Sequence, residues 1–295
     1  MSRVLFVLTP GVHLLDLAGP AQVFSTADGY ALSYVADAPE VPTWQGVTLQ
    51  ASTSWPRLST DDLVLVPGWR DGSDPPGRGL LDRIAEHHAA GGTVASVCAG
   101  AEALGRAGLL DGRRCTTHHG LQDRLARDYP LASVVRDVLY VSDGRVVTSA
   151  GIASGIDLAL HLVALRHGPA AAARVAREMV VYARRNGDEQ QASAMLRHRG
   201  HLSDVVHRVQ DRIDADFASP LPLTELAAGA GVSERTLTRL FEATIGRTPL
   251  RYQQVLRVER AEYLIGHGAT VDAAARAVGF RDARMLRRLR ARVPS

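Results

Sequence analysis

The chain has 295 residues, more than one average domain requires, and its 46% hydrophobic and 22% charged residues are typical of a protein with a substantial core. No apolar run is long enough to span a bilayer, and two cysteines are too few for a disulfide framework. We therefore expect a cytoplasmic protein without membrane contact. The net charge of +3 is uneven, because residues 220–295 hold 13 arginines and 7 acidic residues. A basic C-terminal segment beside a mildly acidic body indicates a nucleic-acid-binding module attached to a separate domain.

Residues 3–167 alternate strand and helix signals. Short β-branched runs bounded by Gly or Pro predict buried strands at Val4–Leu8, Leu63–Val66 and Thr93–Val97. Helix-length segments separate them, among them Gly19–Ala27 and Leu80–Ala90, and Ser142-Asp143-Gly144 predicts a hairpin turn. Alternating strands and helices indicate a doubly wound, mostly parallel α/β sheet with helices on both faces.

A cysteine stands where the third predicted strand ends. Thr93–Ala101 is a buried strand that passes into small residues and then a helix, the arrangement of a nucleophile elbow centred on Cys98. A helix N-terminus favours the thiolate, and His118 and Asp16 are the polar companions that the sequence offers. Two interpretations stay open: inherited architecture in which Cys98 lines a ligand or packing cavity, or a Cys–His hydrolase, lyase or thiol sensor. No spacing indicates a metal site, and we expect no cofactor.

The first domain is expected to end in two Ala-rich helices, from about Ser154 to His167 and from Ala170 to Tyr182. Their apolar faces suit either internal packing or a dimer surface. The polar, aperiodic stretch RRNGDEQQ follows. We therefore predict a domain over residues 1–183, a linker over 184–200 and a second domain over 201–295.

About residues 3–182 resemble the PfpI/ThiJ superfamily, whose fold is flavodoxin-like and similar to class I glutamine amidotransferases. The matching stretches are LLDLAGPAQVF, LVPG, SVCAGAEALGRAGLLDGRRCTTHH and DVLYVSDGRVVTSAGIASGIDLALHLV. The resemblance implies that Cys98 stands at the superfamily's nucleophile and His118 at its histidine. Asp16 stands where enzymatic relatives commonly carry Glu.

The same resemblance places an oxyanion pocket at the backbone amides near Gly68 and Ala99. Trp69 stands where many relatives carry a second Gly, and we expect its ring to narrow that pocket. These residues complete the candidate pocket of the first domain.

Residues 223–237 predict a helix-turn-helix. Gly231 accepts the positive φ of the corner, and Ser233 is a typical N-cap for a second helix whose Leu237 faces inward. The exposed start of that helix is where a recognition helix presents side chains to the major groove. The candidate DNA-contacting residues there are Ser233, Glu234, Arg235, Thr236, Thr238 and Arg239. The alternative is a plain helical hairpin whose arginines only solvate a surface.

Residues 221–265 resemble the first half of the AraC family DNA-binding domain, in the stretch LTELAAGAGVSERTLTRLFEATIGRTPLRYQQVLRVERAEYLI. The resemblance implies a long helix at about Pro249–Ile265 that joins two helix-turn-helix units. The second unit is expected at Thr270–Phe280, with a recognition helix from about Asp282. A stiff connecting helix would separate the two units by roughly 34 Å, one turn of DNA.

The C-terminus is shorter and richer in arginine than is usual in that family, so we expect its residues to contact phosphates more than bases. For the last few residues a solvated tail is an equal alternative. The arginines concerned are Arg281, Arg284, Arg287, Arg288, Arg290 and Arg292.

The order of the two modules resembles the GlxA-type regulators. We therefore expect a sequence-specific transcriptional regulator that binds double-stranded promoter DNA and is controlled by an α/β domain sensing a small molecule or redox state. The resemblance also implies a homodimer. The alternative is a cysteine-dependent amidase or glyoxalase-like enzyme.

Overall fold

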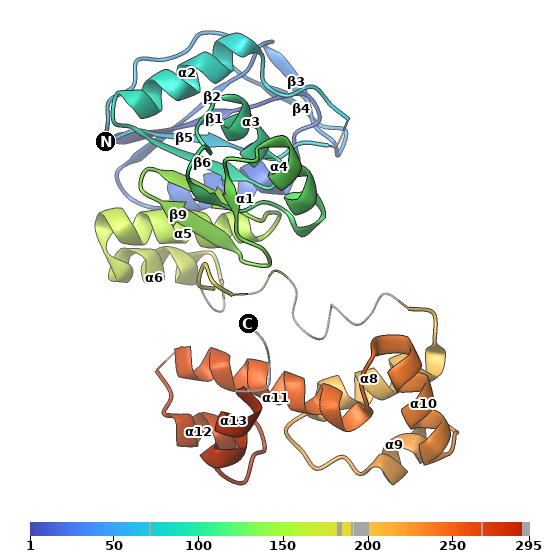
Figure 1. Cartoon of the computed structure of the whole chain (residues 1–295). Coiled ribbons are helices and arrows are strands. Elements are labelled where there is room, and N and C mark those ends of the chain that lie inside the picture. Colours follow the sequence, from blue (N-terminus) through green and yellow to red (C-terminus); the bar gives the residue numbers. More distant parts are fainter. Residues whose placement is uncertain (71, 182–184, 190, 192–200, 267, 291–295) are drawn as a thin grey trace. The chain divides into compact units, whose positions relative to one another are not determined.

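The structure is a computed structural model that describes residues 1–70, 72–181, 185–189, 191, 201–266 and 268–290 (Figure 1). The chain divides into two compact units, Met1–Gln191 and Ala192–Ser295. Most of the predicted linker over 184–200 lies outside the described residues, so its boundaries stay a prediction. No helix in the described part of the chain has the length and apolar character needed to cross a membrane.

The first unit contains a six-stranded sheet in the order β2-β1-β5-β6-β10-β9. All neighbouring strands are parallel except the pair β10 and β9, which is the predicted hairpin. The strands of this sheet are β1 (Ser2–Val7), β2 (Tyr30–Val35), β5 (Leu63–Val66), β6 (Thr93–Val97), β9 (Tyr140–Asp143) and β10 (Val146–Ser149). The doubly wound prediction is confirmed. The sequence reasoning missed the edge strand β2, most of whose residues are half-buried and which therefore lacks the continuous apolar run of its neighbours.

The helices of this unit cover both faces of the sheet. They are α1 (Leu14–Thr26), α2 (Arg78–Ala89), α3 (Gly100–Arg106), α4 (Gln122–Asp128), α5 (Ser154–His167) and α6 (Pro169–Glu178). Short elements complete it: β3 (Glu40–Pro42), β4 (Thr48–Gln50), β7 (Arg114–Cys115), β8 (Ser133–Val134) and the 3-10 turn η1 (His119–Leu121).

Two helix boundaries differ from the prediction. The α1 helix begins at Leu14, not at Gly19, and the Gln45 side chain accepts a hydrogen bond from the Leu14 N–H at 3.0 Å. The α6 helix ends at Glu178, and Val180 then takes a φ of 56°, outside the helical range. The predicted end at Tyr182 lies outside the described residues.

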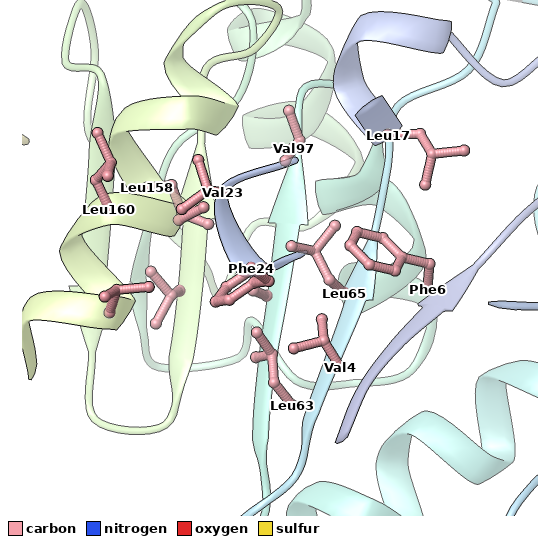
Figure 2. Packing of buried hydrophobic residues seen from close by; sticks show 14 of the residues in the cluster. Val4, Phe6, Leu17, Val23, Phe24, Leu63, Leu65, Val97, Leu158 and Leu160 are labelled. Atoms are coloured by element: carbon pink, nitrogen blue, oxygen red, sulfur yellow. The ribbon is translucent and has the colours of Figure 1, made fainter. Parts of the chain in front are cut away.

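Alternate residues of β1 enter two separate cores. Val4 and Phe6 pack with α1 and α5, as Figure 2 shows, whereas Leu5 and Val7 pack with α2 and α3. This alternation places the carboxyl ends of the central strands between two layers of helices, where α/β folds hold their ligands.

The second unit is helical throughout its described elements and has two cores joined by one long helix. Its helices are α8 (Asp204–Asp216), α9 (Leu223–Gly229), α10 (Glu234–Ile245), α11 (Pro249–Gly266), α12 (Val271–Ala277) and α13 (Ala283–Arg290). The first half of α11 packs with α8, α9 and α10, and its second half packs with α12 and α13. With 18 residues, α11 is about 27 Å long. The predicted pair of helix-turn-helix units on one connecting helix is confirmed.

Candidate functional site

Cys98 occupies a strained corner between β6 and α3. Its φ of 55° lies in the left-handed region, which is uncommon for a residue other than glycine. Its N–H donates to the Ser149 carbonyl at 2.9 Å, and its own carbonyl accepts a hydrogen bond from the Thr117 hydroxyl at 2.7 Å. A side chain at Gly100 would collide with the Val66 carbonyl, so the chain can turn here only with glycine. The backbone therefore forms the predicted elbow.

Asp16 lies against Cys98, and two glycines, Gly68 and Gly151, pack directly on this pair. A Cβ atom at Gly68 would lie 2.5 Å from Asp16 Oδ2 and 2.7 Å from Cys98 Cβ. A Cβ atom at Gly151 would lie 2.5 Å from Cys98 Cβ and 3.0 Å from Asp16 Oδ1. The sequence reasoning missed Gly151, although the TSAGIASG segment that follows β10 is rich in small residues. Asp16 and Cys98 are thus held together because both neighbours lack side chains.

Burial favours the neutral form of both members of this pair. Asp16 is fully buried, and burial raises the pKa of its carboxyl to about 7 against weaker opposing effects of the Cys98 thiol and the Gly68 N–H. Neither carboxylate oxygen has a well-aligned hydrogen bond in the described part of the chain. The pKa of the Cys98 thiol is raised to about 12, first by burial and then by the Asp16 charge. The Ala99 N–H at the start of α3 lowers this pKa, in the direction expected from the sequence, but burial and the Asp16 charge outweigh it.

The histidines near this pair are arranged differently from the prediction. The His118 ring Nδ1 accepts a hydrogen bond from the Gly120 N–H at 3.2 Å, and no hydrogen bond joins this ring to Cys98 among the described residues. Burial lowers the pKa of His118, and His119 and His13 lower it further. The sequence reasoning missed His13, whose Nδ1 lies 3.9 Å from Asp16 Oδ2. The i,i+3 spacing in the HLLD motif was the available signal.

Trp69 lies in the core on the α2 and α3 side, whereas Cys98 belongs to the core on the α1 and α5 side. The two side chains are 4% and 5% exposed. A cavity of about 810 Å³ lies elsewhere in this unit, lined by residues of α1, α5 and α6. No cluster of three metal-ligating side chains occurs among the residues described. In this conformation the elbow region is closed, because Asp16, Cys98 and Trp69 are almost inaccessible to solvent.

The first helix-turn-helix unit consists of α9 and α10. Gly231 takes a φ of 72° at the corner, and the Ser233 hydroxyl accepts a hydrogen bond from the Thr236 N–H at 3.2 Å. Leu237 and Phe241 are fully buried and fix the inward face of α10. The opposite face exposes Ser233, Glu234, Arg235 and Arg239, with Thr236 and Thr238 half-buried beside them. The predicted candidate residues therefore lie together at the start of α10.

The second helix-turn-helix unit, formed by α12 and α13, has the same arrangement of helix caps and glycine corner but a different exposed surface. The Thr270 hydroxyl caps α12 through the Ala273 N–H, and Gly279 forms the corner with a φ of 82°. The Asp282 carboxylate caps α13 by accepting hydrogen bonds from the Arg284 and Met285 N–H groups. The buried face of α13 carries only apolar residues, and the exposed arginines here are Arg281, Arg284, Arg287 and Arg288.

Arg290 differs from these exposed arginines because it forms an ion pair with Glu262 of α11. Arg292 lies outside the described residues.

The chain combines two helix-turn-helix units, each with arginines on its second helix, and an α/β unit that contains the Cys98 elbow. This combination is typical of a DNA-binding regulator with an attached ligand-binding domain. The chain belongs to the DJ-1/PfpI family, whose family model matches residues 2–165. A second family model, described as a helix-turn-helix domain, matches residues 226–293.

Curated relatives agree with this assignment over both units. The chain is 27% identical over 266 residues to the HTH-type transcriptional regulator CdhR of Pseudomonas aeruginosa, a match that covers 88% of this chain and 79% of the relative. The isonitrile hydratase of Pseudomonas putida is 35% identical over 159 residues, covering 53% of this chain and 68% of the hydratase.

A crystal structure of an AraC family transcriptional regulator from Pseudomonas putida shares the fold, with a TM-score of 0.53 and 24% identity, and covers 61% of this chain and 100% of the other. The relative that spans both units is a regulator, whereas the hydratase match covers about half of the chain. The protein is a helix-turn-helix transcriptional regulator with a DJ-1/PfpI domain, a function that is better supported than the alternative of a cysteine-dependent enzyme.

Proposed function

We propose that the two helix-turn-helix units divide the recognition of promoter DNA, with α10 reading bases and α13 holding phosphates. The observation that carries this proposal is the exposed face of α10, where Arg235 and Arg239 stand opposite the buried Leu237 and Phe241. Neither arginine has an ion-pair partner among the described residues. Because Arg donates two hydrogen bonds to guanine O6 and N7, such a face is suited to the major groove.

The surface of α13 supports a different role. Its exposed side chains are mainly arginines, and the polar variety of Ser, Thr and Glu that α10 presents is missing from its described face. A uniform cationic face binds the phosphate backbone without distinguishing bases. We therefore assign Arg281, Arg284, Arg287 and Arg288 to phosphate contact.

The DJ-1/PfpI unit is the proposed sensor of a small molecule. The best support is the Asp16 carboxyl, which is buried, lacks a well-aligned hydrogen bond in the described chain and has a pKa near neutrality. A ligand that donates a hydrogen bond would find an acceptor there once the site opens, because Asp16 is fully buried, and His13 Nδ1 lies 3.9 Å from Asp16 Oδ2. The raised pKa of Cys98 makes direct oxidation slow, because the thiolate is the reactive form. A ligand is accordingly a better effector than an oxidant.

The active form is proposed to be a homodimer, in keeping with the palindromic operators that two-fold symmetric regulators bind. The side chains of Leu165 on α5 and Val180 after α6 are exposed, and we propose them as parts of the pairing surface. Sedimentation of the full chain tests this: a single species of twice the chain mass is expected, and a monomer at micromolar concentration would contradict it.

The function as a whole is tested by genome-wide occupancy of the full chain and of a chain that lacks residues 202–295. Discrete promoter sites should disappear when the segment is removed, and sites that persist would contradict the proposal. A parallel assay with Cys98→Ala separates the enzyme alternative. DNA binding should survive this substitution, whereas turnover of amide or dicarbonyl substrates that depends on Cys98 would favour an enzyme.

A further inference from the structure

One arginine in the middle of α11 is bonded to both helix-turn-helix units. Arg257 Nε donates to the Phe217 carbonyl at 2.6 Å, and its Nη2 donates to the Ala218 and Ser219 carbonyls at 3.2 and 2.8 Å. Its Nη1 donates to the Gly279 carbonyl at 3.1 Å. The first three carbonyls follow the end of α8, which packs in one core with the first helix-turn-helix unit, and the fourth lies in the corner of the second helix-turn-helix unit.

Two neighbouring contacts show that this junction is closely packed. A side chain at Gly279 would collide with the Ala218 carbonyl, so the corner of the second unit lies directly on the segment that follows α8. The buried Gln253, one helical turn before Arg257, donates to the Phe217 and Ser219 carbonyls at 2.9 and 2.8 Å. The Phe217 side chain packs against both cores of this unit.

The guanidinium is held by carbonyl dipoles and has no carboxylate partner among the described residues. It is half-buried over the Phe280 ring, 5.7 Å from its centroid, and burial lowers its pKa. A cation is favoured at the C-terminal end of a helix, where carbonyl groups are left without helical partners. Only a planar group with five N–H donors can bond four such carbonyls at once, and the single point charge of Lys cannot replace it.

We propose that this set of contacts, which we call the Arg257 junction, fixes the spacing of the two recognition helices and thereby makes the protein select operators by the distance between half-sites. The inference rests on the proposed function, in which both α10 and α13 contact DNA. A helix of about 27 Å alone does not set the orientation of the units attached to it, because each unit can turn about its own connection. The junction removes this freedom because Arg257 is hydrogen-bonded both to the corner of the second helix-turn-helix unit and to the segment that follows α8.

A rigid connection changes how affinity depends on the operator. When two sites are held at the correct separation, binding of the second is intramolecular and adds about 100-fold in affinity, and this gain disappears when geometry prevents simultaneous binding. With the junction intact, inserting base pairs between half-sites should remove this gain. When the junction is loosened, the second unit can follow the displaced half-site, and the penalty for insertion should become small.

The test uses the full-length protein and an operator selected by the wild-type chain from random-sequence duplexes, together with versions that carry insertions of two and five base pairs between the half-sites. We expect the insertions to weaken wild-type binding by about 100-fold. Arg257→Gln should bind the uninterrupted operator more weakly than the wild type does. Its affinity should fall by less than about fivefold when base pairs are inserted between the half-sites. Arg260→Gln removes the same charge from an exposed position on α11 and should retain the wild-type penalty.

Each outcome decides between alternatives. The inference would be overturned if Arg257→Gln lost as much affinity on insertion as the wild type does. It would also be overturned if the selected operator had one half-site, or if the wild-type chain bound the operators with insertions as tightly as the uninterrupted one. If Arg257→Gln fails to bind even an isolated first half-site, the decision passes to Arg257→Lys. This variant should show a reduced insertion penalty, and an unchanged penalty would overturn the inference. A wild-type chain that selects no duplex at all would instead contradict the proposed function.

Discussion

The Cys98 site of the α/β unit and the α10 surface of the helical unit differ in the solvent exposure of their chemically active side chains. In the first unit Asp16 and Cys98 are buried, and both pKa values are raised toward the neutral forms. In the second unit Arg235 and Arg239 are exposed and keep their charge available. Both regions contain a recognisable motif at the expected place. Burial, which a motif does not report, decides whether the groups of a motif can act.

This contrast also explains why a family that includes an isonitrile hydratase can supply a domain to a regulator. A nucleophile must be ionised or readily deprotonated, and the buried Asp16–Cys98 pair opposes the second negative charge. Ligand binding at this pair needs no ionised thiol, but it requires the site to open, because Asp16 and Cys98 are buried.

The largest effect expected from this comparison concerns Asp16 and pH. The carboxyl keeps its proton to about pH 7 when folded but loses it near pH 4 when unfolded, so the stability it contributes is present at low pH and lost as pH rises from about 4 to 7. The decline amounts to at most about 4 kcal/mol. Asp16→Asn should abolish it.

Urea denaturation followed by tryptophan fluorescence measures this in the full chain, since Trp44, Trp55 and Trp69 all belong to the first unit. Asp82→Asn, at an exposed position paired with Arg78, is the control and should retain the wild-type pH dependence. Equal pH dependence in wild type and Asp16→Asn would show that the buried carboxyl is not neutral.

The next largest effect is the loss of DNA affinity in Arg235→Ala combined with Arg239→Ala. Each base contact contributes roughly 1–3 kcal/mol, so the double variant should bind the operator at least about 30-fold more weakly in anisotropy titrations. Arg78→Ala with Arg83→Ala removes the same charge from the exposed face of α2 and should change affinity little. A decrease below about threefold in the α10 variant would contradict the assignment.

A smaller and qualitatively different effect is expected for α13. Replacing Arg284, Arg287 and Arg288 with Gln should weaken binding by roughly tenfold to all duplexes alike and reduce the slope of log affinity against log salt by about one for each phosphate that the variant no longer neutralises. The measurement is a salt titration on the operator and on an unrelated duplex. A changed ratio between the two duplexes would show that α13 reads bases.

The smallest effect concerns the caps of the two units. Ser233→Ala and Thr270→Ala each remove the hydroxyl that accepts a hydrogen bond from the N–H of the third residue of the helix, at a cost of about 1 kcal/mol. Hydrogen exchange should accelerate at the start of α10 in the first variant and at the start of α12 in the second. Ser233→Asp preserves the cap and should restore protection at α10. Unchanged exchange in Ser233→Ala would show that the hydroxyl does not stabilise the start of this helix.

Features that depend on local sequence were predictable. The apolar runs of β1, β5 and β6, the elbow at Cys98, the cap at Ser233 and the corner at Gly231 are each specified by a few adjacent residues. The edge strand β2 was missed because its half-buried positions carry no continuous apolar signal.

Features that depend on residues distant in the chain were not predictable. The closure of the Cys98 site by Gly151 and the bonding of Arg257 to both helix-turn-helix units arise only when separate segments meet. The pKa of Cys98 was misjudged for the same reason, since the burial that raises it comes from elements far from β6 in the sequence.

The claim that α10 reads bases is tested most directly by selecting random-sequence duplexes with the full-length wild type, with the Arg235→Ala and Arg239→Ala double variant, and with the Arg284, Arg287 and Arg288 triple variant. The wild type should select a defined sequence, the α10 variant should lose base preference within one half-site, and the α13 variant should select the wild-type sequence with lower yield. Selection of the wild-type sequence by the α10 variant would contradict the claim.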